Sequence, residues 1–226
     1  MMKLGSRAYI IAESGTCHSA PTPAERYDRA EKYIAAAFAC GANAVKFQMF
    51  AKPLDDVFCR IAGDEAREER WGNSAISLDG WRRLKAFADI LGLDLLFSVF
   101  QTRTVEWLRA LNVKATKVAS RASANFPYED ATGTLLISTG MPPYPPAKGI
   151  LLECESKYPS DRPWRGEYPG FSAHSPTPDL AIDAIKRGCK LVEVHFYIDP
   201  SHAGRDLPAS LTLDGLRAVC AARDEK

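Results

Sequence analysis

Residues 8–48 read AYIIAESGTCHSAPTPAERYDRAEKYIAAAFACGANAVKFQ, and this stretch sets the pattern of the whole chain. The short apolar runs at its two ends, Ala8–Glu13 and Ala44–Gln48, predict strands that are buried on both faces. The amphipathic segment between them, Pro23–Cys40, predicts a helix with Thr22 as its N-cap. Strand, helix and strand in this order indicate one βαβ unit of a parallel sheet.

The same alternation continues to the end of the chain. Further strands are predicted at Leu93–Ser98, Ala115–Ser120, Thr134–Ser138, Ile150–Cys154, Gly170–Ala173 and Leu191–Tyr197. Further helices are predicted at Leu78–Leu91, Thr104–Leu111, Pro178–Arg187 and Leu213–Ala222. Eight strands with interleaved helices predict an α/β fold, a (β/α)8 TIM barrel, as one domain over residues 1–226. The alternative is a doubly wound open sheet.

The connections after the fifth and sixth strands break this pattern. Residues 139–149 read TGMPPYPPAKG, and four prolines exclude a helix of normal length there. Residues 155–169 are also rich in proline, glycine and charge. We therefore predict that the helices after strands five and six are absent or vestigial. Either the proline loops or a second subunit would cover the outer face of these strands, and we favour a homodimer.

Composition excludes several classes of function. The 226 residues carry a net charge of +1, and a quarter of them are charged, so broad binding to nucleic acid or anionic membranes is not expected. No apolar run approaches the roughly 20 residues that span a bilayer, and the N-terminus lacks a signal-peptide cleavage site. The six cysteines form no CxxC pair and are expected to be reduced thiols. We expect a cytoplasmic protein.

The four histidines follow or end the first, seventh and eighth predicted strands, which are neighbours in a closed barrel. They are His18, His174, His195 and His202. The carboxyl ends of barrel strands line the active site, and neutral imidazoles with a carboxylate suit a divalent transition metal. His174 and His195 are the expected metal pair, with His18 as a neighbour and His202 in a solvent-exposed loop. The alternative is that each histidine is merely a loop or core residue.

Lysines lie inside two other predicted strands, at Lys46 and Lys117. A buried ammonium needs a partner, and hydroxyls beside two lysines would form a nest for a phosphate or carboxylate. Polar neighbours at the same strand ends are Gln48, Ser98, Ser120, Arg121, Ser138 and Thr139. Alternatively, the lysines pair with Glu13 or Asp94 and only support the barrel. A metal facing an anion nest indicates a reaction between an anionic donor and an electrophile that the metal polarises.

Several segments, taken in order, resemble the N-acetylneuraminate (sialic acid) synthase family over roughly residues 8–215. They are YIIAESGTCHSA, AFACGANAVKFQ, LLFSVF, KVASRASAN, LLISTGM, LLECESKYP, GFSAHS and LVEVHFYID. The resemblance implies a metal-dependent condensation of phosphoenolpyruvate with an aldehyde sugar, in which a carbon–carbon bond forms and phosphate leaves.

The resemblance also assigns residues to this chemistry. His174 and His195 match ligands of Mn²⁺ or Mg²⁺, Glu13 matches a residue at the sugar and metal end, and Asp206 matches an aspartate of the loop after strand eight. The positions that hold phosphoenolpyruvate match Lys46, Ser98, Lys117, Ser120 and Ser138. The candidate catalytic residues are Glu13, Lys46, Lys117 and Asp206. The candidate substrate-binding residues are Lys46, Gln48, Ser98, Lys117, Ser120, Arg121, Ser138 and Glu153.

The sequence departs from the family on the acceptor side. Cys17 replaces an asparagine, Arg121-Ala122 replaces Gly-Glu, and Glu153 replaces a histidine. Ala173 replaces an aspartate and Val194 a lysine. In the loop after strand eight, Arg205 replaces a proline and Leu207 a histidine. We find no clear equivalent of the family's asparagine after strand six or of its C-terminal antifreeze-like domain. We therefore expect an acceptor other than N-acetylmannosamine. Candidate acceptor residues are Cys17, Arg121, Glu153, Arg165 and Arg205. Three arginines among them favour an acidic or phosphorylated acceptor.

Two other functions stay open on the sequence. One is a metal-dependent aldolase or lyase that acts on a phosphorylated sugar. The other is a non-catalytic relative that binds a phosphorylated ligand or a partner protein through a degenerate site.

Overall fold

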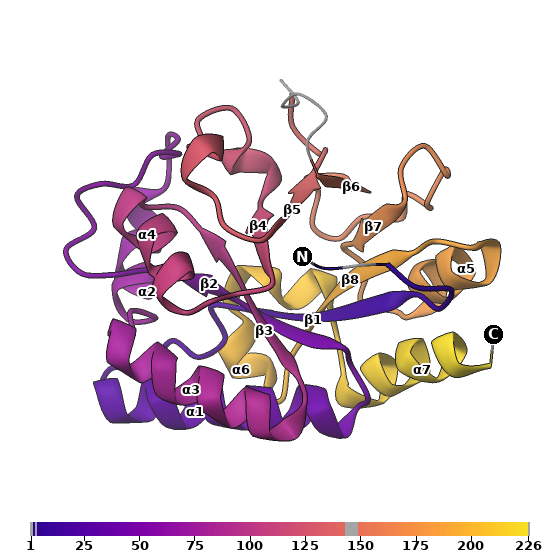
Figure 1. Cartoon of the computed structure of the whole chain (residues 1–226), viewed down its shortest axis with the longest axis horizontal. Coiled ribbons are helices and arrows are strands. Elements are labelled where there is room, and N and C mark those ends of the chain that lie inside the picture. Colours follow the sequence, from indigo (N-terminus) through magenta and orange to yellow (C-terminus); the bar gives the residue numbers. More distant parts are fainter. Residues whose placement is uncertain (1, 3, 143–148, 226) are drawn as a thin grey trace.

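A computed structural model describes residues 2, 4–142 and 149–225, and its parallel strands close into a barrel (Figure 1). The barrel strands are β1 (Tyr9–Gly15), β2 (Ala44–Met49), β3 (Asp94–Val99), β4 (Ala115–Val118), β5 (Thr134–Ser138), β6 (Ile150–Glu153), β7 (Gly170–Ala173) and β8 (Leu191–Phe196). Each strand pairs in parallel with the next, and β8 pairs with β1. A short strand, β9 (Ser210–Leu211), adds to β8. The TIM barrel is confirmed, and the open sheet is wrong.

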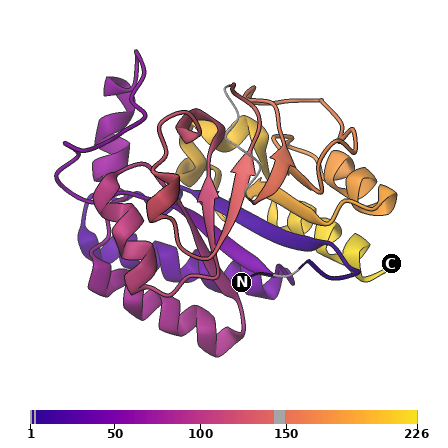
Figure 2. The ribbon, with the colours of Figure 1, turned by 45° about the horizontal axis from the view of Figure 1, so that its top comes forward.

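Helices lie around this barrel. They are α1 (Pro23–Ala39), α2 (Glu65–Gly72), α3 (Leu78–Leu91), α4 (Thr102–Ala110), α5 (Asp179–Arg187), α6 (Pro200–Ala203) and α7 (Leu213–Asp224). Helix α1 packs against α3 and α5 against α7 (Figures 1 and 2). Thr22 and Glu25 form a reciprocal capping box at the start of α1, as its sequence predicts. No described helix is long and apolar enough to cross a membrane.

Helix α2 is absent from the sequence-based prediction. Its residues, EAREERWG, are mostly charged, and only Trp71 and Gly72 are buried. The segment therefore has no apolar periodicity from which a helix could be inferred. Its N-terminal half is acidic and Arg70 lies in its last turn, which favours the helix dipole.

The connection after β6 is irregular, as predicted, because residues 154–169 form no helix. The connection after β5 can be compared only in part, because residues 143–148 lie outside the described residues. After β4 the chain makes two 3₁₀ turns, η1 (Ser120–Ala122) and η2 (Tyr128–Asp130), so Ser120 belongs to a turn and not to the predicted strand. The homodimer stays a prediction.

The barrel interior consists of an apolar layer beneath a polar layer. Strand alternation turns every second residue inward. The apolar layer is Ile11, Ala44, Leu96, Ala115, Leu136, Leu152 and Leu191. Two positions further along the same strands come Glu13, Lys46, Ser98, Lys117, Ser138, Cys154 and Glu193. The polar side chains thus pack directly on top of a buried apolar layer.

His18 belongs to the core between the barrel and its helices. Its ring packs edge-on against Phe47 and Trp81, with centroid distances of 5.1 and 5.6 Å. Nε2 lies 2.8 Å from the Ser74 carbonyl oxygen and donates to it. The predicted grouping of four histidines is therefore wrong for His18, because the turn after β1 directs it outward. His202 is half-buried beside Tyr33, with 6.3 Å between the ring centroids.

We predict that His18 makes the fold acid-sensitive. Burial lowers the pKa of His18 to about 3 from 6.5. As pH falls through this interval, the unfolded chain takes a proton at His18 and the folded chain does not, so the free energy of unfolding falls. Denaturant titrations at pH 7, 6 and 5 should show a shallower pH dependence for His18→Gln, by up to about 1.4 kcal/mol per pH unit. An unchanged pH dependence would mean that His18 is protonated in the folded protein.

Candidate active site

Lys46 of β2 stands at the centre of the polar layer. Its ammonium forms an ion pair with the Glu13 carboxylate of β1 and donates a 2.8 Å hydrogen bond to Ser98 Oγ of β3. Glu193 Oε2 of β8 lies 3.5 Å from the same nitrogen. All four side chains are almost fully buried. Buried charges need such partners, and four separate strands supply them.

Lys117 of β4 shares one of these carboxylates. Its ammonium donates to Ser138 Oγ at 2.7 Å and lies 3.6 Å from Glu193 Oε1. Ser172 Oγ of β7 also donates to Glu193 Oε1, at 2.9 Å. Glu193 therefore lies between the two lysines and connects both sides of the polar layer, which we call the barrel floor.

Sequence reasoning missed Glu193, although a signal existed. The residue lies two positions before His195 in LVEVHFYID, so both side chains point to the same face of β8. The alternative pairing with Asp94 is wrong, because Lys114 and the Tyr9 hydroxyl hold that carboxylate at 2.5 and 2.6 Å. The pairing of Lys46 with Glu13 is present.

The two buried glutamates have opposite pKa shifts. Burial raises the pKa of Glu13 to about 7, although Lys46 opposes the shift. At Glu193, Lys117 and Lys46 outweigh burial and lower the pKa to about 2. Glu193 is therefore the permanent anion of the floor, and Glu13 is the carboxyl that can hold a proton near neutral pH. With Glu13 protonated, two lysines face one carboxylate, and the floor favours a bound anion.

His174 and His195 face each other beside this floor, with ring centroids 5.5 Å apart. The Glu155 carbonyl oxygen lies 2.6 Å from His174 Nδ1 and fixes the proton there, so Nε2 is the nitrogen of this ring that accepts. Tyr158 stacks on His174 at 4.2 Å, and its hydroxyl lies 3.2 Å from Nε2. Burial lowers the pKa of both histidines to about 4, so both are neutral at pH 7.

The histidine pair fits a divalent cation as a partial set of ligands. Neutral imidazoles are suitable donors, and a backbone carbonyl oxygen fixes the tautomer of His174. Within the described residues, no group of three His, Cys, Asp or Glu side chains is arranged to hold a metal ion. A cation bound by His174 and His195 would therefore take its remaining ligands from water or substrate.

A glycine opens space where the first strand ends. Gly15 has φ +56°, and a Cβ there would lie 3.0 Å from Asp206 Oδ2, 3.6 Å from Glu13 Oε1 and 3.7 Å from Gln48 Nε2. Glu13, Gln48 and Asp206 therefore surround the space beside the Cα of Gly15, which a side chain at this position would fill. Burial raises the pKa of Asp206 above its ordinary value.

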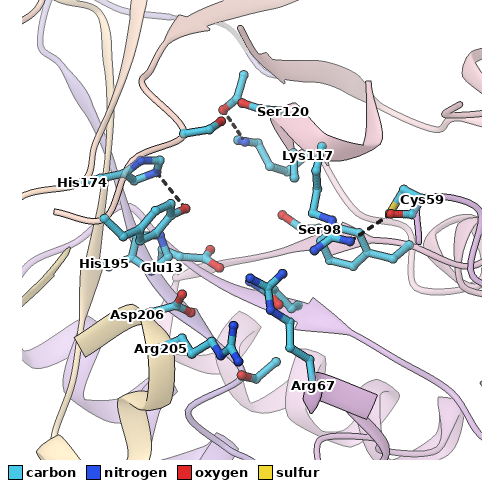
Figure 3. A pocket seen from close by; sticks show the side chains of 18 of the residues that line it. Glu13, Cys59, Arg67, Ser98, Lys117, Ser120, His174, His195, Arg205 and Asp206 are labelled. Atoms are coloured by element: carbon cyan, nitrogen blue, oxygen red, sulfur yellow. Dashed lines mark hydrogen bonds between the residues drawn. The ribbon is translucent and has the colours of Figure 1, made fainter. Parts of the chain in front are cut away.

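These groups line one cavity of about 750 Å³, which is large enough for two small substrates (Figure 3). The candidate residues that line it are Glu13, Lys46, Gln48, Ser98, Lys117, Ser120, Arg121, Ser138, His174, His195, Arg205 and Asp206. Ser120 Oγ accepts from the Gly140 amide at 3.0 Å and lies 3.0 Å from Cys154 Sγ. Arg121 is engaged by Asp64 and by the Cys59 carbonyl oxygen, at 2.9 Å.

Three acceptor candidates lie outside the cavity. Glu153 points away from the barrel interior, because its neighbour Leu152 points inward, and its carboxylate accepts from three backbone amides of the loop after β6 at 2.7–3.1 Å. The prediction that Glu153 binds substrate is therefore wrong. Arg165 in that loop is exposed and pairs with Glu167. Cys17 is buried against the Phe196 carbonyl oxygen, and burial raises its pKa to about 12.

Two arginines of α2, which the sequence-based prediction omitted, line the cavity as well. They are Arg67 and Arg70. No apolar periodicity in the sequence predicted α2. The barrel topology alone also does not place the segment between β2 and α3 at the carboxyl ends of the strands. Only the tertiary contacts of Arg70 and Arg121 place α2 at the cavity mouth.

A model of the NeuB family matches residues 33–163 and 165–225 of this chain. The match covers most of the sequence and includes seven of the eight barrel strands. The chain belongs to the NeuB family. The resemblance inferred from the sequence is confirmed at this level.

Two curated relatives of this NeuB family member are synthases by name. The chain is 28% identical to N-acetylneuraminate-9-phosphate synthase of Drosophila melanogaster, over 97% of its own length and 68% of the relative. It is 24% identical to N,N'-diacetyllegionaminic acid synthase of Campylobacter jejuni, over 95% of its length and 75% of the relative. The chain thus spans about two thirds of the length of the Drosophila relative.

A solved structure shows the same fold. The N-acetylneuraminic acid synthetase of Leptospira borgpetersenii superposes with a TM-score of 0.81 at 20% identity, over 99% of this chain and 86% of that one. At this identity the likeness concerns the fold alone.

We predict that the barrel floor depends on Glu193. Glu193→Gln would leave Lys46 and Lys117 facing each other without their shared anion. Loss of one partner from a buried ion pair costs about 3–5 kcal/mol, so urea denaturation should show a fall of this size in the free energy of unfolding. Glu167→Gln, which breaks an exposed pair with Arg165, is the control and should cost less than about 1 kcal/mol. Equal small effects of both substitutions would contradict this role of Glu193.

Proposed function

We propose that this chain condenses phosphoenolpyruvate with the aldehyde form of a sugar. The observation that carries the proposal is the division of one cavity into two poles. Lys46, Lys117 and serine hydroxyls form one pole, and the neutral pair His174 and His195 forms the other. Membership of the NeuB family and the names of the synthase relatives support this reading.

The lysine pole would hold the anionic donor. Lys46 and Lys117 supply positive charge, and their serine partners can turn their hydroxyls toward carboxylate or phosphate oxygens. The serines at this pole are Ser98, Ser120 and Ser138, and Gln48 adds an amide donor nearby. In binding the donor, the lysines would exchange part of their contact with Glu13 and Glu193 for contact with the substrate.

The histidine pole would hold the acceptor aldehyde. Mn²⁺ or Mg²⁺ bound by His174 and His195 would supply a Lewis acid that polarises a carbonyl oxygen. Arrangement of the two substrates by opposite poles brings the methylene carbon of the donor close to the aldehyde carbon. The side chains would thereby orient the reactants for attack and exclude water from all positions other than C2 of the donor.

Glu13 lies at the junction of the two poles. It stands opposite Lys46 on β2 and opposite His195 on β8. Because its pKa is raised to about 7, Glu13 can hold a proton at its carboxyl and give it up near neutral pH. We assign Glu13 and Asp206 the proton transfers of the reaction.

The overall reaction balances without an oxidant or reductant. The methylene carbon of phosphoenolpyruvate forms a bond to the aldehyde carbon, and the aldehyde oxygen takes a proton. Water adds to the cation at C2 of the donor, and phosphate leaves by cleavage of its C–O bond. The products are one chain-extended keto acid and inorganic phosphate.

Phosphate release tests the proposal directly. Purified protein with phosphoenolpyruvate, Mn²⁺ and a panel of aldoses should release inorganic phosphate, and His195→Ala should abolish the release. The matched control His202→Ala should retain it, because His202 lies outside the cavity. Phosphoenolpyruvate should also raise the melting temperature, since it binds the folded state.

Other outcomes separate the alternatives. Cleavage or joining of a phosphorylated sugar without phosphate release would identify an aldolase or lyase. Failure to release phosphate with every aldose, together with no melting shift by phosphoenolpyruvate and no uptake of Mn²⁺, would favour a non-catalytic relative. Either result would overturn the condensation.

A further inference from the structure

The loop after β6 holds His174 at three points. The Glu155 carbonyl oxygen lies 2.6 Å from Nδ1, and the Ser160 amide donates to the His174 carbonyl oxygen at 2.7 Å. The Tyr158 ring stacks on the His174 ring, with 4.2 Å between the centroids and 24° between the planes. Because all three contacts come from one short segment, the loop sets both the tautomer of His174 and the position of Tyr158 against it.

The lone pair of His174 Nε2 is occupied by a hydrogen bond. A carbonyl oxygen only accepts, so Nδ1 carries the ring proton and Nε2 accepts. The Tyr158 hydroxyl lies 3.2 Å from Nε2 and donates to it. Ser172 Oγ lies 3.5 Å from Nε2, but its single proton goes to Glu193 Oε1, which is 2.9 Å away. Tyr158 is therefore the donor to Nε2.

This lone pair is also the one that His174 offers to a divalent cation, because a metal binds the unprotonated nitrogen of a neutral imidazole. The two histidine rings lie on one side of the cavity (Figure 3). Tyr158 stands edge-on to the second of them, His195, with 5.7 Å between the ring centroids. Tyr158 thus packs against both side chains of the histidine pole and uses the lone pair of one.

Tyr158 is far more exposed than the two histidines. His174 and His195 are 7% and 5% exposed, whereas Tyr158 is 42% exposed in a segment without helix or strand. Within the residues that the structure describes, its hydroxyl has no second hydrogen-bond partner. Release of Tyr158 from His174 therefore breaks one hydrogen bond, which water replaces when the hydroxyl turns outward.

We propose that Tyr158 is a positioning residue that gates the cation site: its hydroxyl closes the Nε2 lone pair of His174 and must turn away before His174 binds a divalent cation. The inference rests on the proposed function, which assigns the cation to His174 and His195. The closed arrangement satisfies a buried nitrogen and holds the ring in place. The same bond competes with the cation, so it lowers the affinity for metal.

Tyr158→Phe tests the gate because it keeps the stacked ring and removes only the hydroxyl. Calorimetric titration with Mn²⁺, without either substrate, should give a dissociation constant about two- to tenfold lower for the variant, since no hydrogen bond has to be displaced. Tyr128→Phe is the matched control. It removes a hydroxyl that donates to the Ser123 carbonyl oxygen at 2.9 Å, away from the residues that line the cavity, and should leave the Mn²⁺ affinity unchanged. Circular dichroism melts verify that both variants fold.

Nitration of the unaltered chain gives a second readout. Tetranitromethane modifies tyrosines whose hydroxyl reaches solvent, and mass spectrometry of peptides locates the product. Mn²⁺ should raise the nitration rate of Tyr158, because the cation favours the arrangement in which its hydroxyl has turned outward. The rate at Tyr27, which lies against Arg83 outside the cavity, should not change.

Equal or weaker Mn²⁺ binding by Tyr158→Phe would overturn the gate, because a merely structural residue or a ligand of the cation would lose affinity on substitution. A nitration rate of Tyr158 that Mn²⁺ leaves unchanged or lowers would also overturn it. Failure of the proposed function looks different: no aldose would release phosphate, while the tighter Mn²⁺ binding by Tyr158→Phe would persist. Absence of Mn²⁺ binding in all three proteins would overturn the gate together with the metal step of the proposed function.

Discussion

The barrel interior depends on the ion pairs that the buried carboxylate of Glu193 forms with Lys46 and Lys117. Two lysines point into the interior from strands β2 and β4, and Glu193 lies 3.5 and 3.6 Å from their ammonium groups. Without a shared anion, two buried ammonium groups would repel each other and lose their hydration. The arrangement keeps positive charge available at a position that hydrophobic packing alone would never tolerate.

This ionic floor connects the two kinds of chemistry in the cavity. Glu193 precedes His195 by two residues, so the same strand face carries both the anion of the floor and one histidine. On β1, Glu13 stands in register with both Lys46 and His195. A proton on Glu13 therefore changes the field felt by a ligand at either pole. The apolar layer beneath excludes water and strengthens these interactions.

Much of the barrel follows from local patterns. Apolar runs such as Ala44–Gln48 predicted strands, and the capping box at Thr22 marked the start of a helix correctly. The inward positions of Lys46 and Lys117 could be inferred because alternation is a local property of a strand. Glu153 was misassigned because the same alternation, applied one residue later, turns its carboxylate outward to a loop.

Longer-range contacts were beyond such reasoning. Whether a histidine after a strand faces the mouth or the outer core depends on the turn that follows, as His18 and His174 show. Helix α2 could not be found because only Trp71 and Gly72 of it are buried, and because Arg70 of its last turn contacts two distant loops. The arginines of the mouth were therefore misjudged: Arg165 lies outside, and Arg67 was missing from the candidates.

The sequence by itself determined the order of strands and helices and the inward positions of Lys46 and Lys117, because periodicity and strand ends are properties of neighbouring residues. It favoured the closed barrel over the open sheet, and His174 with His195 as the metal pair. Only the tertiary structure decided which charges meet. Ion pairs such as Lys117 with Glu193 join residues far apart in the chain, and their existence depends on barrel closure and register. The same closure gathered Arg67 and Arg205 at one cavity.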